Sequence, residues 1–204
     1  MPEQDLLYWS KRLYQKGMSP GTSGNISVRT QNGVLISRTN VCLNDMSEDD
    51  LILLDYDGNI LKGTQKPSSE RFLHLEIYRE REDINAIIHS HCPYITAYAV
   101  ANLPIAEPIM PEFVYHFGEI PLAPYALPST FQLAEETLKP FKKGYNTVLM
   151  ANHGVVTGAD TLKECFYNLE ALRTYCETSF GAAVLGGAKK LNKKQIEEIR
   201  KLKG

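Results

Sequence analysis

The 204-residue chain has few of the features that mark membrane, secreted or nucleic-acid-binding proteins. Its longest apolar stretches, such as residues 182–185, are far too short to span a bilayer. The acidic start of the chain (residues 1–5) has no apolar segment behind it that would indicate a signal peptide. The four cysteines have no CxxC spacing, which argues against a disulfide framework. The net charge of −2 argues against a surface that binds nucleic acids. We therefore expect a cytoplasmic protein with reduced thiols that binds neither nucleic acids nor membranes.

What the sequence does contain is the composition of an ordinary globular protein, with 43% hydrophobic and 23% charged residues. The length predicts a single domain over residues 1–204. Positive charge gathers in residues 189–204, where seven Lys and Arg face two Glu, a net charge of +5. We interpret this segment as a basic, solvated C-terminal helix or tail. The alternative is a segment that folds over an anionic substrate or a neighbouring subunit.

Hydrophobic periodicity and turn signals predict alternating helices and strands without internal repeats. Helices are expected over residues 5–16, 69–81, 129–138 and 161–183, with two more that begin near Pro93 and at Asn192. Strands are expected over residues 25–29, 34–37, 51–55, 84–88, 118–123 and 147–151. The fold class is therefore α/β, with helices on the faces of a mostly antiparallel or mixed sheet. A dinucleotide-binding fold is not expected, because the glycines of residues 21–24 lead into a strand and lack GxGxxG spacing.

Three of the five histidines follow or end apolar strands. His89 and His91 are two residues apart, so their side chains lie on the same face of a strand. Such a pair alone is more typical of a core or surface pair than of a metal site. His153, followed by Gly154, stands at the end of a second apolar strand and favours the metal interpretation. Three nitrogen ligands with an open position are typical of a catalytic rather than a structural zinc site. We interpret His74, in a helix, and His116, in an irregular stretch, as lying outside this site.

Three polar segments could hold an anion. Residues 66–70 (Lys-Pro-Ser-Ser-Glu) place two hydroxyls and Glu70 at a helix start, where unpaired N–H groups favour negative charge. Residues 21–25 (Gly-Thr-Ser-Gly-Asn) allow backbone N–H groups to approach a ligand closely. Residues 37–40 (Ser-Arg-Thr-Asn) add further donors. A helix cap and a tight turn are the alternative interpretations of the first two segments.

These motifs, in this order and spacing over residues 5–185, resemble the class II aldolase/adducin family and most of all its sugar-phosphate aldolases. The resemblance implies a three-layer α/β/α sandwich around a mainly antiparallel central sheet. It also implies a homotetramer with active sites between subunits. Zn²⁺, or another divalent transition metal, would be bound by His89, His91 and His153. Glu70 would be an interchangeable fourth ligand and the catalytic acid/base.

The resemblance also assigns the substrate phosphate and leaves one catalytic group open. The residues that match the family's phosphate site are Gly24, Asn25, Thr39, Asn40, Ser68 and Ser69. Tyr115 is a candidate for protonating the departing aldehyde oxygen, with a buried core tyrosine as the alternative. Arg38 is either a phosphate ligand or a solvated cation, and Glu112 has no assigned role.

The implied function is a metal-dependent aldolase that cleaves a ketose 1-phosphate reversibly to dihydroxyacetone phosphate and an aldehyde. Breaking the C3–C4 bond places negative charge beside a carbonyl, which a chelating cation would stabilise as an enediolate. Glu70 would exchange the C3 proton, and for this we expect burial to raise its pKa. The alternatives within the family are a sugar-phosphate epimerase, a dehydratase and a decarboxylase, and outside catalysis an adducin-like assembly module.

Overall fold

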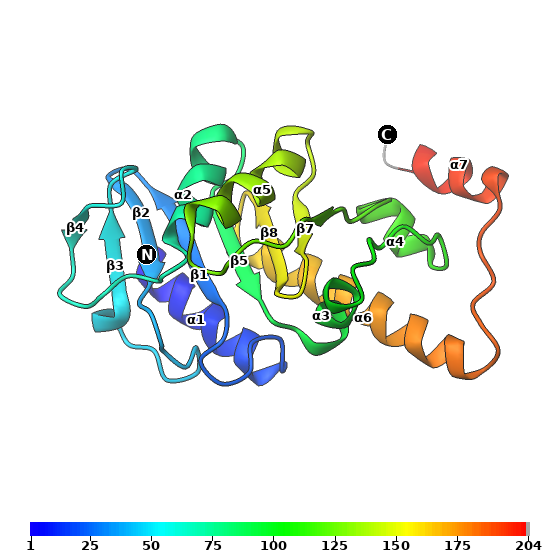
Figure 1. Ribbon diagram of the computed structural model, residues 1–204, viewed down its shortest axis with the longest axis horizontal. Coiled ribbons are helices and arrows are strands. Elements are labelled where there is room, and N and C mark those ends of the chain that lie inside the picture. Colours follow the sequence, from blue (N-terminus) through cyan, green and yellow to red (C-terminus); the bar gives the residue numbers. More distant parts are fainter. Residues whose placement is uncertain (203–204) are drawn as a thin grey trace.

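The computed structural model describes residues 1–202 and has one sheet between two layers of helices (Figure 1). Within these residues, eight strands follow the order β4-β3-β2-β1-β5-β8-β7-β6. Neighbouring strands are antiparallel except for β6 and β7, which are parallel. The strands are β1 Asn25–Thr30, β2 Gly33–Ser37, β3 Leu51–Leu54, β4 Ile60–Lys62, β5 Ala86–Ser90, β6 Leu122–Ala123, β7 Thr147–Met150 and β8 Gly154–Ala159.

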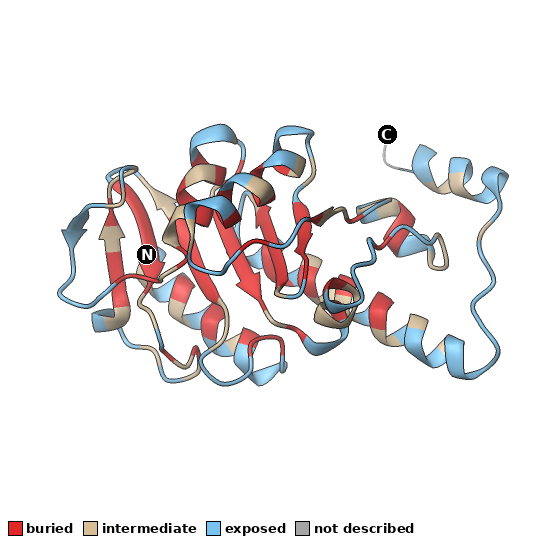
Figure 2. Cartoon of the chain, viewed as in Figure 1, coloured by how far each residue is buried: buried red, intermediate tan, exposed pale blue. Residues whose placement is uncertain are grey.

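Helices cover both faces of the sheet. They are α1 Pro2–Gln15, α2 Arg71–Glu80, α3 Pro93–Val100, α4 Pro111–His116, α5 Phe131–Lys142, α6 Leu162–Val184 and α7 Lys193–Lys201, with one 3₁₀ turn at Glu48–Asp50. One apolar core joins α1, α3 and α6 to one face of the sheet, and a second joins α2 and α5 to the other. Figure 2 shows the buried residues concentrated on the strands and on the inward faces of these helices. The expected α/β/α sandwich with a mainly antiparallel sheet is therefore confirmed.

The basic C-terminal segment forms a helix that stands apart from the sheet (Figure 1). Asn192 caps α7 by a reciprocal pair of hydrogen bonds with Gln195. None of the residues of α7 is buried, and the helix packs against α4. A salt bridge from Lys190 to Glu107 and a backbone hydrogen bond from Leu191 to Pro108 fasten the connecting segment. Residues 193–201 thus form an exposed helix, and that this segment is solvated rather than in contact with a substrate or a neighbouring subunit stays a prediction.

Several predicted elements differ from the observed ones. The strand predicted over 84–88 runs from 86 to 90, so that His89 lies within it. Only the last two residues of the strand predicted over 118–123 pair with β7. The sequence analysis missed β8, because its glycines at 154 and 158 interrupt the strand pattern, and it missed β4, which has three exposed residues. It also missed α4, a six-residue helix in a proline-containing stretch read as irregular.

Two further expectations concern the environment of the chain. None of the described helices is long and apolar enough to cross a membrane. All four cysteines are free thiols, and three of them are buried.

Truncation of the core on α6 tests this packing. Leu172 is completely buried between α6 and the sheet, so Leu172→Ala should lower the free energy of unfolding by about 2–5 kcal/mol. Leu202→Ala removes the same atoms from a side chain that is 74% exposed and should change it by less than about 0.5 kcal/mol. Urea denaturation measures both, and equal losses would contradict the packing described.

Candidate metal centre

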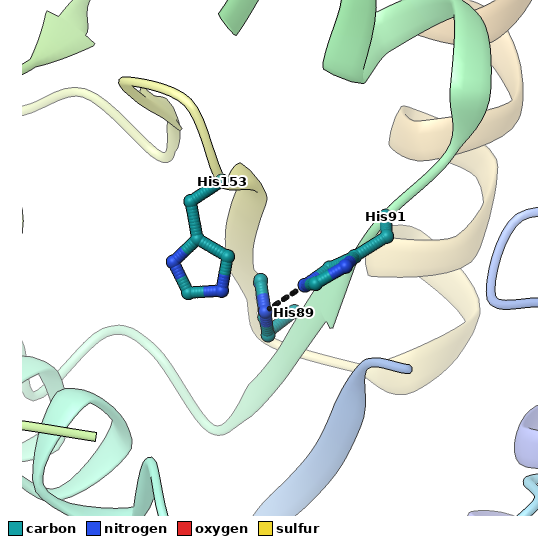
Figure 3. A group of neighbouring side chains, drawn as sticks. All are labelled: His89, His91 and His153. Carbon is teal, nitrogen blue, oxygen red and sulfur yellow. Dashed lines mark hydrogen bonds between the residues drawn. The ribbon is translucent and has the colours of Figure 1, made fainter. Parts of the chain in front are cut away.

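Three histidines converge at one end of the central strands. His89 and His91 come from the end of β5, and His153 lies in the turn that joins β7 to β8. Pairing of β5 with β8, with His89 opposite Val156, brings the two segments together. The ring centroids lie 4.8–5.0 Å apart, and the candidate ligand nitrogens all lie within 4.8 Å of one another. Figure 3 shows the three rings turned toward a common space.

The hydrogen bond of His89 to the backbone determines which of its ring nitrogens can bind a cation. Its Nδ1 lies 3.0 Å from the carbonyl oxygen of Val155, which only accepts hydrogen bonds, so Nδ1 carries the proton. The lone pair of Nε2 then points into the cluster, 2.9 Å from Nε2 of His91. Backbone carbonyls that accept a hydrogen bond from the other ring nitrogen commonly orient metal-binding histidines in this way.

Burial favours the neutral form of all three rings, which is the form that binds metals. Burial lowers the pKa of His89 and of His91 below the ordinary histidine value. Burial together with the neighbouring His89 lowers the pKa of His153 to about 4. The donor set therefore fits a divalent transition ion such as zinc.

Glu70 lies beside the histidines, immediately before α2. Its two carboxylate oxygens are each 3.2 Å from a ring nitrogen, one from His89 Nε2 and the other from His153 Nε2. The side chain is 8% exposed, and among the described residues its Oε1 has no hydrogen-bond partner. A buried, unsatisfied carboxylate oxygen next to three imidazoles is the environment of a cation site.

The pKa of Glu70 differs from the expectation. Burial raises it, but the two neighbouring histidines and an N–H of Asn25 outweigh burial, so the pKa lies below the ordinary glutamate value. The expected rise in pKa was therefore wrong, because the sequence did not show that two histidines and an amide N–H surround this carboxyl. At neutral pH the carboxyl group of Glu70 is therefore ionised and can accept a proton.

A cavity of about 210 Å³ opens next to the histidines. Its walls include Glu70, His91, His153 and all six residues matched to the phosphate site: Gly24, Asn25, Thr39, Asn40, Ser68 and Ser69. The structure thus brings these residues together, while their roles stay predictions. It also adds Thr22, Ser23, Arg38, Pro128 and Ser129 to the walls. Pro128 and Ser129, which lie just before α5, were not predicted as site residues, because Ser129 was assigned to the start of a helix.

Backbone conformation explains why the wall has these residues. Gly24 has a φ of +78°, and a Cβ there would lie 2.7 Å from the backbone oxygen of His89. Only glycine fits so close to the metal-ligand strand. Asn40 has a φ of +54°, a left-handed conformation that asparagine tolerates. Ser68 accepts a hydrogen bond from the N–H of Glu70 and thereby holds the start of α2.

Other candidate residues lie outside the cavity or are held by partners. Tyr115, Glu112 and His116 belong to α4, which packs against α6 and α7, and none of them is in the cavity wall. Arg38 is in the wall, but its guanidinium forms a salt bridge with Asp50 and donates to the backbone oxygen of Thr39.

His74 is a different case. It does not belong to the three-histidine cluster, as expected, but its ring contacts the cavity residue Asn25. The sequence did not predict this contact, because helical spacing alone did not show that this face of α2 lies over β1.

Comparison with known proteins identifies the relatives of this chain. The family model for the class II aldolase and adducin N-terminal domain matches residues 4–180. A 5-deoxy-D-ribulose 1-phosphate aldolase of Bacillus thuringiensis is 32% identical over 97% of this chain and 93% of its own. A 3-oxo-tetronate 4-phosphate decarboxylase of Haemophilus influenzae is 35% identical over 83% of this chain and 82% of its own. The solved structure of an L-fuculose 1-phosphate aldolase is 29% identical, with a TM-score of 0.90 over 98% of this chain and 95% of its own.

Removal of one imidazole tests the metal centre. His91→Ala leaves two ring nitrogens at the site, so the purified variant should contain less than about a tenth of the zinc of the wild type. His116→Ala removes a histidine from α4 and should leave the zinc content unchanged. Metal analysis by mass spectrometry measures both variants, and full zinc content in the His91 variant would exclude this residue as a ligand.

Proposed function

The chain belongs to the class II aldolase and adducin family, and we propose that it is a metal-dependent aldolase that cleaves a ketose 1-phosphate reversibly to dihydroxyacetone phosphate and an aldehyde. One observation carries the proposal: a single cavity is lined both by His91, His153 and Glu70 and by hydroxyl and amide donors, which we propose form its two ends. A phosphorylated sugar has the matching pair of ends, because its phosphate and its reacting carbons are separated by a few bonds.

The donor end would hold the phosphate. Ser69, Thr39 and Asn40 offer hydroxyl, amide and backbone donors, and the start of α2 favours negative charge there. Binding energy gained at the phosphate fixes the reacting carbons at the other end of the cavity. An L-fuculose-1-phosphate-like ketose is the substrate class that these features and the aldolase relatives support.

The imidazole end would carry out the proton transfer. His89, His91 and His153 would hold a divalent cation, which would supply Lewis-acid stabilisation of the negative charge that develops on the substrate oxygens. Glu70, ionised and buried, would take the C3 proton of dihydroxyacetone phosphate in the condensation direction. In the cleavage direction the proton that leaves the C4 hydroxyl would reach Glu70 through solvent, and Glu70 would pass it to C3 after the C3–C4 bond has broken.

Assembly would complete the site. We keep the prediction of a cytoplasmic homotetramer with active sites between subunits. Exposed apolar side chains on neighbouring parts of α3 and α6, including Tyr94 in contact with Phe180, support an interface there. The acid role proposed for Tyr115 depends on this assembly, since Tyr115 is not in the cavity wall of its own chain.

A decarboxylase is the second candidate, favoured by the 35% identity to the Haemophilus influenzae enzyme. Loss of carbon dioxide also leaves an electron pair beside a carbonyl, and Glu70 would then take up a proton from solvent and pass it to that carbon. A panel of ketose 1-phosphates assayed for dihydroxyacetone phosphate, and 3-oxo-tetronate 4-phosphate assayed for carbon dioxide, distinguishes the two. Turnover of the second substrate alone would replace the aldolase proposal.

Neutralising Glu70 tests the acid/base role. Glu70→Gln keeps the size of the side chain but cannot accept a proton, so kcat should fall about 100- to 10,000-fold. The zinc content should stay near that of the wild type, because the three histidines are intact. Steady-state kinetics and metal analysis measure the two quantities, and a full aldolase rate would show that another group moves the proton.

Removing one hydroxyl tests the phosphate end. Ser69→Ala should raise KM for the ketose phosphate about 10- to 100-fold, since a hydrogen bond to a charged group is worth about 1.5–3 kcal/mol. Ser179→Ala removes a hydroxyl that bonds Tyr98, outside the cavity wall, and should leave KM unchanged. Equal KM values for both variants would place the phosphate elsewhere.

A further inference from the structure

A line of buried polar groups runs from Glu70 away from the cavity and into the core between α2 and β1. Asn25 Nδ2 donates to Glu70 Oε2 at 2.9 Å, and the other amide atom, Oδ1, lies 2.5 Å from His74 Nε2. His74 Nδ1 lies 2.7 Å from Ser27 Oγ, which lies 2.8 Å from the hydroxyl of Tyr78. All five residues are buried, and His74 and Ser27 are completely so.

These contacts have one consistent direction. A carboxylate oxygen only accepts, so the Asn25 amide turns its N–H toward Glu70 and its oxygen toward His74. His74 must then carry its proton on Nε2 and accept at Nδ1 from the Ser27 hydroxyl. That hydroxyl accepts in turn from Tyr78. Burial lowers the pKa of His74 to about 3, in keeping with a neutral ring with one donor and one acceptor.

The matching repeats of a helix and a strand produce this arrangement. Glu70, His74 and Tyr78 are spaced by four residues along α2 and its start, a rise of about 6 Å per step. Asn25 and Ser27 are two apart on β1, a step of about 6.8 Å on one face. The side chains of the strand therefore fit between those of the helix in alternation.

We propose that His74 is a positioning residue, which fixes the amide of Asn25 so that its N–H holds the carboxylate of Glu70 against the histidine cluster. This inference rests on the function proposed above for Glu70. His74 does not line the cavity, and it acts on the reaction only through Asn25. Without the Nε2–H of His74, the Asn25 amide is free to turn, and Glu70 then loses the N–H that orients its carboxylate.

Two substitutions of His74 separate this role from simple packing. Gln places an amide N–H about as far along the side chain as the imidazole Nε2, so His74→Gln keeps a donor toward Asn25. His74→Asn is shorter and reaches only the Ser27 side. We expect His74→Gln to keep kcat within about threefold. His74→Asn should lower kcat about 10- to 100-fold, the usual loss when a residue that orients a site residue is changed, with KM and zinc content unchanged.

Tyr78→Phe removes only the hydrogen bond between Tyr78 and Ser27, at the far end of these buried groups, and should lower the melting temperature but not kcat.

Equal losses of kcat in the Gln and Asn variants, or a loss of kcat in Tyr78→Phe as large as in His74→Asn, would overturn the proposal.

A measurement that needs no substrate keeps this proposal separate from the proposed function. In ¹⁵N-histidine-labelled, zinc-loaded wild-type protein, NMR should show His74 as the Nε2–H tautomer. The Nδ1–H tautomer would overturn the proposal whether or not the protein is an aldolase, and whether or not the variants fold. If the wild type turns over none of the sugar phosphates, the aldolase proposal fails, while the tautomer still tests whether His74 donates a hydrogen bond to Asn25.

Discussion

The meeting of three imidazoles at the end of the central strands is the constraint on which the rest of the site depends. It requires β5 and β8 to pair in the observed register, because a slip of one residue would turn His89 to the opposite face of the sheet. The short turn between β7 and β8 then brings in His153. Gly154 follows that turn, where a Cβ would lie 2.6 Å from the backbone oxygen of Ser90. Sheet pairing and close backbone approach together fix the distances between the ligands.

The surroundings of the imidazoles determine their chemistry. Burial keeps the rings neutral, and the carbonyl of Val155 selects the tautomer of His89 that leaves Nε2 available. Glu70 is buried as well, yet it stays ionised because histidines and the Asn25 amide surround it. The contacts of Glu70 with these histidines and with Asn25 both lower its pKa and orient its carboxylate. Hydroxyl and amide donors line the same cavity as His91, His153 and Glu70.

Much of this arrangement could be predicted from the sequence, because its signals are local. The spacing of His89 and His91 indicates one strand face, and the capping pattern at Asn192 indicates a helix start. What the sequence did not show depends on contacts between distant segments. The pKa of Glu70 depends on neighbours 19 to 83 residues away, and the link from His74 to Asn25 requires α2 to lie over β1. Short elements such as β4 and α4 have too few residues for a periodic pattern.

The most direct test of the account is a crystal structure of the zinc-loaded protein with anomalous diffraction recorded at the zinc edge. The account predicts one strong anomalous peak per chain, about 2.0–2.1 Å from a ring nitrogen of each of His89, His91 and His153, with at least one coordination position open to the cavity. A zinc ion bound elsewhere, or the three rings without any ion after zinc loading, would contradict it.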